Sequence, residues 1–136
     1  MIAGFAAPLS GLMAQSKRLA VSADNVANMR SRGLRADGPP VESGGQPGAF
    51  VPKRTQDVTA AGGGVRAEVR PVTPPSVEVY APGSPDADAN GVAVIANVNL
   101  AEELVTQIQA QRAYEANAKA FRIQDEVLDS LLDIKS

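Results

Sequence analysis

Residues 97–134 read NVNLAEELVTQIQAQRAYEANAKAFRIQDEVLDSLLDI, and this stretch contains neither glycine nor proline. Such a composition favours a single uninterrupted helix, which we expect over residues 100–134. At about 1.5 Å per residue that helix is roughly 50 Å long, too long for a small globular chain to cover by itself. The sequence therefore indicates that something outside the chain covers part of this helix.

The start of the helix is marked by Asn99 and Glu102. Asn99 can accept a hydrogen bond from an early backbone N–H while Glu102 reaches back, as in a capping box. Beyond this start, residues at spacings of three and four form a seam that polar side chains interrupt twice. The seam consists of Leu104, Ile108, Gln111, Tyr114, Ala118, Phe121, Asp125, Leu128 and Leu132. Because polar residues in a seam commonly set register and partner choice, we expect an assembly of several subunits.

A second seam near the N-terminus has the same spacing and predicts a helix over residues 7–29. Its members are Phe5, Leu9, Leu12, Ser16, Leu19, Ala23 and Val26. Arg30, Ser31, Arg32 and Gly33 follow, and we expect them to provide a basic last turn and a stop at glycine.

The charges of the two predicted helices are opposite. Residues 1–36 hold five basic residues and one acid, a balance of +4, whereas residues 98–136 hold seven acids and four basic residues, a balance of -3. We expect a mainly α fold, in which long N- and C-terminal helices pair as an antiparallel coiled coil with a small loop-rich β insert between them. Periodicity alone is equally compatible with an ordinary amphipathic helical hairpin.

Glycine and proline gather between the two helices, which divides the chain into residues 1–32 (N-terminal axial helix), 33–97 (insert) and 98–136 (C-terminal axial helix). Within the insert, residues 37–48 and 60–64 are predicted loops. Residues 65–70 alternate apolar and charged side chains and are the best strand candidate, followed by residues 77–80. Residues 49–53 and 92–96 could add short edge strands.

The composition excludes most chemistry. The chain has no cysteine and no histidine, so it lacks thiol chemistry, the commonest general base and the commonest metal ligand. Asp86 and Asp88 resemble the opening of a calcium loop, but Asn97 stands where the essential glutamate belongs, and a turn with exposed carboxylates is the better interpretation. We expect no enzyme, no cofactor and no metal.

A net charge of -2 gives no reason to expect nucleic acid as a partner. Residues 2–14 are apolar, but Lys17 and Arg18 follow them instead of preceding them, so we expect no cleaved secretory signal. No run approaches 18 apolar residues, so we expect no insertion into a membrane.

Two motifs resemble a known family. Residues 19–28, LAVSADNVAN, look like the early helix motif of the axial proteins of the bacterial flagellum. Residues 97–105, NVNLAEELV, followed by residues 111–117, QRAYEAN, look like the C-terminal signature of the same proteins. The chain thus resembles the flagellar basal-body rod proteins, the short subunits of the proximal rod in particular. The motif residues that carry the resemblance are Asn25, Ala27, Asn28, Asn99, Glu102, Arg112, Tyr114 and Asn117.

The resemblance implies a structural subunit of the basal-body rod, which is exported by the flagellar type III apparatus and polymerises through its terminal helices into the periplasm-spanning drive shaft for motility. The implied partners are copies of the chain, other axial proteins of the rod and possibly the hook side, and the export apparatus. The assembly seam would consist of Phe5, Leu9, Leu12, Leu19, Val26, Leu104, Ile108, Tyr114, Phe121, Leu128 and Leu132. The alternative hypothesis is a cytoplasmic helical-hairpin adaptor or chaperone that binds partner helices through the same stripe.

Overall fold

The computed structural model describes residues 3–33, 49–61 and 63–134, which form two long helices and five strands. The helices are α1 (Ala3–Asn28) and α2 (Leu100–Asp133). The strands are β1 (Arg32–Gly33), β2 (Lys53–Thr59), β3 (Val65–Pro71), β4 (Ser76–Tyr80) and β5 (Val92–Ala96). The predicted loop over residues 37–48 lies outside the described residues.

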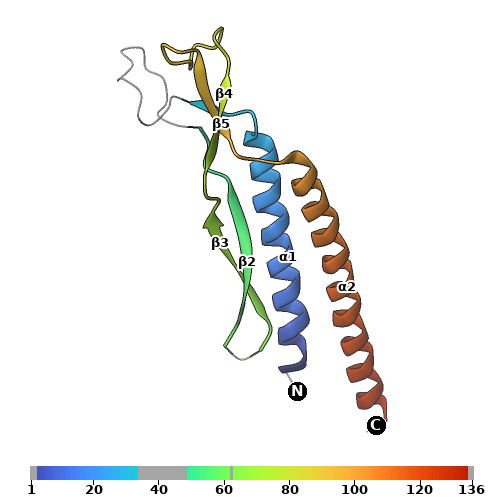
Figure 1. Cartoon of the computed structure of the whole chain (residues 1–136). Coiled ribbons are helices and arrows are strands. Elements are labelled where there is room, and N and C mark those ends of the chain that lie inside the picture. The colour runs from blue at the N-terminus through green and yellow to red at the C-terminus, as the bar shows by residue number, and fades with distance from the viewer. Residues whose placement is uncertain (1–2, 34–48, 62, 135–136) are drawn as a thin grey trace.

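Helix α1 lies between the β2–β3 hairpin and α2 (Figure 1). Phe5, near the start of α1, contacts Phe121 in the second half of α2, and Ser22, near the end of α1, bonds to Glu103 at the start of α2. The two helices therefore run in opposite directions (Figure 1). The remaining strands form a small sheet at the other end of the molecule, where α1 ends and α2 begins (Figure 1). One face of α2 packs on α1, and the rest of its surface faces outward.

The prediction of a mainly α fold is wrong, because the structure holds five strands in two sheets beside its two helices. Antiparallel β2 and β3 form one sheet, with Lys53 opposite Pro71 and Thr59 opposite Val65. The other sheet has the order β1-β5-β4 and is also antiparallel. β2 was not predicted, because its sequence, KRTQDVT, does not alternate apolar and polar residues. It is nevertheless as long as β3.

The predicted coiled coil is also wrong. Its seam residues Leu9, Leu19, Leu104 and Ile108 are all more than 40% exposed. The helices instead approach through small and polar residues. A Cβ added to Gly11 would lie 2.6 Å from Asn117 Oδ1, and Ala14, Ser22 and Ala110 are buried. Close backbone approach through glycine and alanine replaces the interlocking of large apolar side chains.

The ends of the helices follow local sequence. Asn99 is the N-cap of α2, and its side chain accepts hydrogen bonds from the backbone N–H groups of Ala101 and Glu102. Glu102 in turn accepts a hydrogen bond from the Asn99 side-chain amide at 3.2 Å. α1 begins at Ala3, earlier than predicted, and ends at Asn28, so Arg30 and Arg32 lie beyond the helix and do not form its last turn.

The core is built from small side chains. Its buried hydrophobic residues are Ala14, Ala67, Ala93, Val94, Ala96 and Ala110, and the largest side chains that are fully buried are Asn25, Pro52 and Ser22. Because buried area per residue sets the hydrophobic stabilisation, an alanine core contributes little free energy. Hydrogen bonds at a few buried polar positions therefore fix how the elements are arranged.

Candidate assembly surface and its polar junction

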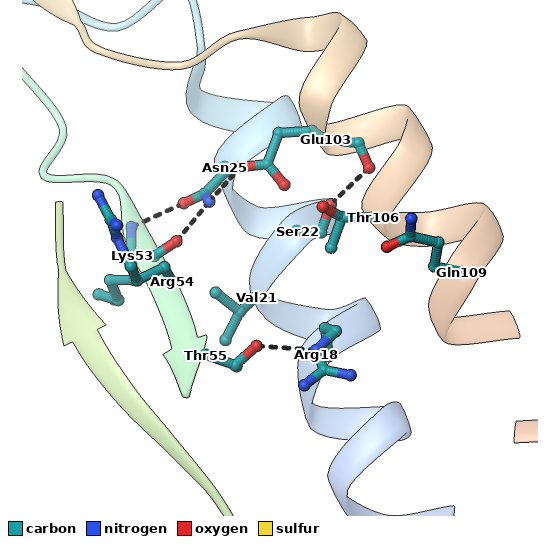
Figure 2. A pocket seen from close by; sticks show the side chains of 10 residues that line it. All are labelled: Arg18, Val21, Ser22, Asn25, Lys53, Arg54, Thr55, Glu103, Thr106 and Gln109. Atoms are coloured by element: carbon teal, nitrogen blue, oxygen red, sulfur yellow. Dashed lines mark hydrogen bonds between the residues drawn. The ribbon is translucent and has the colours of Figure 1, made fainter. Parts of the chain in front are cut away.

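A polar junction centred on Asn25 joins three elements (Figure 2). The Asn25 side chain is 1% exposed. Its amide nitrogen donates to the backbone oxygen of Lys53 at 2.7 Å and to Glu103 Oε1 at 2.6 Å, and its oxygen accepts from the backbone N–H of Lys53 at 3.0 Å. One residue of α1 thereby holds the first residue of β2 and the first turn of α2.

Ser22 lies one turn before Asn25 and completes this junction. Its hydroxyl donates to the backbone oxygen of Glu103 at 3.2 Å, so Glu103 is held through both its main chain and its carboxylate. An open groove of about 220 Å³ passes beside these residues, between β2 and α2 (Figure 2). Nine of its ten lining residues have polar side chains, but they include neither paired acids nor a nucleophile placed beside a base.

A second set of polar contacts fastens the β2–β3 hairpin along α1. Arg18 donates to Thr55 Oγ1 at 3.2 Å and forms an ion pair with Asp57 at 2.6 Å. Further along α1, the Ser10 hydroxyl accepts from the backbone N–H of Val65 at 3.1 Å, next to the turn of the hairpin. The hairpin is thus held at both of its ends by hydrogen bonds and by only one buried side chain, that of Ala67.

The surface of α2 carries large apolar side chains that are more than 40% exposed. They are Leu100, Leu104, Val105, Ile108, Tyr114, Ile123, Val127, Leu131 and Leu132. Leu104 is 48% exposed, Ile108 55% and Leu132 68%. They lie on both sides of the face of α2 that packs on α1, where Ala110 is buried. So many exposed large apolar side chains on one helix are typical of a protein–protein contact.

The proposed seam residues are divided between two environments. Leu9, Leu19, Leu104, Ile108, Tyr114 and Leu132 are exposed, whereas Phe5, Leu12, Val26, Phe121 and Leu128 are half-buried within the subunit. Phe5 and Phe121 contact each other with ring centroids 5.0 Å apart. The seam therefore does not form one continuous surface, and its Phe5–Phe121 pair joins the two helices within the subunit.

The motif residues are also divided. Asn25 is at the polar junction, Asn28 bonds back to Asp24, and Asn99 caps α2. The Asn117 side chain lies against Gly11 and donates to the backbone oxygen of Ala113. Ala27, Glu102, Arg112 and Tyr114 are exposed on the helices. The motif therefore combines residues that shape the subunit with residues that face outward.

Sequence reasoning missed Ser22, Arg18 and Glu103. A signal for them was present, since Gly11, Ala14, Arg18, Ser22 and Asn25 recur at spacings of three and four. This stripe of small and polar residues is the side of α1 that faces the hairpin and α2. Apolar periodicity does not reveal this stripe, because the stripe contains one alanine and no larger hydrophobic residue.

The described residues hold no group of three or more acidic side chains placed to bind a metal ion. The Asp86–Asp88 segment forms a turn, in which Asp88 Oδ1 accepts from the backbone N–H groups of Asn90 at 2.8 Å and Val92 at 2.9 Å. Within the same described part of the chain, neither helix is apolar enough over a sufficient length to cross a membrane.

Comparisons with known proteins point to a single family. Residues 8–30 match the family model described as flagella basal body rod protein, and residues 90–134 match the model described as flagellar basal body rod FlgEFG protein C-terminal. The chain is 42% identical over 112 residues to the flagellar basal-body rod protein FlgC of Salmonella typhimurium, covering 79% of this chain and 78% of the relative. It is 33% identical to the FlgC of Agrobacterium fabrum, covering 92% and 88%. It is 34% identical to the FlgC of Aquifex aeolicus, covering 88% and 86%.

Proposed function

Because this chain belongs to the flagellar basal-body rod protein family and is FlgC-like, we propose that it polymerises through its terminal helices into the periplasm-spanning drive shaft. Membership makes it a structural subunit located in the rod of the flagellar basal body. Our proposal concerns how it reaches that place and which surfaces join it to its neighbours.

The exposed apolar surface of α2 is the observation that carries the proposal. α2 has 34 residues, and in the single subunit its side chains Leu104, Ile108 and Leu132 are about half exposed or more. Burying each such side chain against a neighbour gains about 1.5–3 kcal/mol, and a row of them is enough to drive association. We propose that the exposed seam residues on both helices make these contacts.

We propose copies of the same chain and other axial proteins, including hook-side ones, as the neighbours. The model matched by residues 90–134 names FlgE, FlgF and FlgG in its description, so a C-terminal region of this type is common to several axial proteins. Subunits with the same terminal helix can follow one another in a continuous tube through repeated heterologous contacts.

We further propose that the flagellar type III apparatus exports the chain in an unfolded form. The thin core of alanine and polar residues supports this step, because little buried apolar area has to be exposed when the chain unfolds. A cytoplasmic adaptor would also need an exposed helical stripe, but the family to which the chain belongs favours the rod.

Deletion of the gene tests the proposal when swimming and basal-body structure are recorded in the same cells. We expect basal bodies that keep their membrane rings but lack the rod and hook, and we expect the intact gene in trans to restore both. Complete hooks with normal swimming in the deletion strain would refute the structural role. Export is tested separately by whether the chain reaches the culture medium in cells with a working export apparatus and stays inside cells without one.

A further inference from the structure

The outer face of the β2–β3 hairpin, which we call the arginine face, is formed by the side chains that alternate away from α1. Thr55, Asp57 and Ala67 face α1. The intervening residues share the opposite side of the sheet because side chains alternate along a strand. The arginine face consists of Arg54, Gln56, Val58, Arg66, Glu68 and Arg70, with Arg54 directly opposite Arg70 and Gln56 opposite Glu68.

The arginine face has three arginines and one glutamate, a formal balance of +2. Glu68 is shared between Arg66 at 2.7 Å and Arg70 at 3.5 Å. The hydrogen bond from Arg66 and the charges of both arginines keep the pKa of the Glu68 carboxyl below its usual value, so Glu68 stays ionised. This single carboxylate cannot neutralise all three guanidinium groups.

Placing Arg54 directly across from Arg70 is locally unfavourable, since like charges opposite each other destabilise a strand pair. Arg66 is 71% exposed and Arg70 59%, so both remain accessible to an outside partner. Sequences that break a local rule commonly do so where a function requires it. The unbalanced positive charge therefore points to an anionic partner.

The complementary surface is the last part of α2, residues 123–134, which we call the acidic end. It contains Asp125, Glu126, Asp129 and Asp133 and no basic residue. Asp125, Glu126 and Asp129 are exposed. Since Phe121 lies beside Phe5 and the first described residue of α1 is Ala3, the acidic end extends past the beginning of α1.

The two surfaces of one subunit cannot meet. The hairpin lies beside α1 from Ser10 to Asn25, which is the level of α2 from about Asn117 back to Glu103. Where α2 does come close to the hairpin, at the groove beside Asn25, it does so through its first turns and not through its acidic end. A contact between the two surfaces therefore needs a second subunit, placed beside the first and shifted along the helix axis.

We propose that the arginine face of one subunit docks on the acidic end of α2 in a second copy of this chain. The contact joins two different surfaces, so it is heterologous, and with its axial shift it continues as a helix of subunits. The guanidinium groups of Arg54, Arg66 and Arg70 donate hydrogen bonds to the carboxylates of Asp125, Glu126 and Asp129. This inference rests on the proposed function, because it names the surfaces through which copies polymerise.

Cysteine cross-linking tests the contact, because the natural chain contains no cysteine. Gln56→Cys places a thiol at the centre of the arginine face, and Ser130→Cys places one beside Asp129, without changing any of the charges. We would combine both substitutions in one chain, express it in place of the natural protein, isolate basal bodies and oxidise them. We expect species of twice and higher multiples of the subunit mass, and their loss on reduction.

The matched control combines Gln56→Cys with Lys17→Cys, which is exposed on α1 but lies outside both surfaces. We expect no cross-linked species from it. If the chain enters basal bodies but the test pair forms no more cross-links than the control pair, the proposed contact is wrong and the rod function stands. If even the natural chain is absent from isolated basal bodies, both proposals fail.

Charge exchange gives a second measurement that does not depend on thiol geometry. Arg54→Glu with Arg70→Glu should abolish swimming, and adding Glu126→Arg with Asp129→Arg in the same chain should restore part of it. Lys17→Glu with Lys119→Glu changes the net charge equally at exposed positions outside both surfaces and should leave swimming unchanged. Equal loss in the control variant, or no rescue by the exchange, would overturn the proposed contact.

Discussion

Asn25 Nδ2 donates a 2.6 Å hydrogen bond to Glu103 Oε1, which joins a buried residue of α1 to the first turn of α2. The same amide group exchanges two hydrogen bonds with the backbone of Lys53 at the start of β2. This one side chain thus bonds to both the hairpin and α2.

Replacement of Asn25 by alanine should lower the free energy of unfolding by about 2–4 kcal/mol. The substitution removes three hydrogen bonds and leaves the part-buried backbone N–H and C=O groups of Lys53 without these partners, at roughly 1–3 kcal/mol for each group that stays unsatisfied. Urea unfolding followed by circular dichroism measures this loss. Asn28→Ala is the matched control, since Asn28 bonds only within its own helix, to Asp24, and a loss of equal size there would contradict the assigned role of Asn25.

Replacement of Gly11 by alanine should destabilise the helix pair, because the new methyl group would lie 2.6 Å from Asn117 Oδ1. Overpacking at a close contact costs about 1–3 kcal/mol, which exceeds the roughly 1 kcal/mol that alanine gains over glycine inside a helix only if the Asn117 side chain cannot turn away. Asn117→Ala in the same chain removes the obstacle and should recover most of that loss. A double-mutant cycle from thermal unfolding measures the coupling, and strictly additive effects would show that the two residues do not limit the approach of the helices.

Replacement of Arg18 by alanine should loosen the hairpin without unfolding α2. Arg18 supplies the hydrogen bond to Thr55 and the ion pair with Asp57, and few apolar contacts support the hairpin there. Hydrogen exchange should become faster in β2 and β3 and stay unchanged in residues 103–121. Lys17→Ala, one position away and exposed, should change neither region, and uniform acceleration in the Arg18 variant would indicate global destabilisation instead.

Replacement of Leu104 by aspartate should abolish swimming, although the chain is still made, exported and able to fold. Leu104 is 48% exposed, so the charge does little inside the subunit but is costly once a neighbour buries it. Phe121→Asp should differ, because it breaks the contact with Phe5 and lowers the stability of the subunit itself. Swimming assays combined with proteolysis of the purified variants separate the two effects, and normal swimming with Leu104→Asp would remove Leu104 from the assembly seam.

Local signals made part of the fold predictable. The Asn99 cap defined the start of α2, and the strands predicted at residues 65–70 and 77–80 correspond to β3 (Val65–Pro71) and β4 (Ser76–Tyr80). These features depend on backbone groups and on neighbours in the sequence, so a single sequence contains them. β5 also forms at the suggested residues 92–96.

The packing between elements was not predictable in the same way. The apolar seam suggested that Leu104 and Ile108 face α1, but Glu103 and Ala110 do so, because the tight contact at Gly11 leaves room only for small and polar side chains. β2 was missed because its α1-facing residues, Thr55 and Asp57, are stabilised by Arg18 on a different element. Both errors arise from partners that are distant in sequence.

The alanine and asparagine interior also affects the mechanics of the subunit. Packing by small side chains resists little when a chain is pulled from one end, so unfolding such a subunit needs less work than unfolding one with a core of leucine and phenylalanine. In the rod that we propose, stiffness would then come from neighbouring subunits that pack on α2. A shaft built in this way is assembled from pieces that are individually compliant, and it becomes able to bear torque only as a whole.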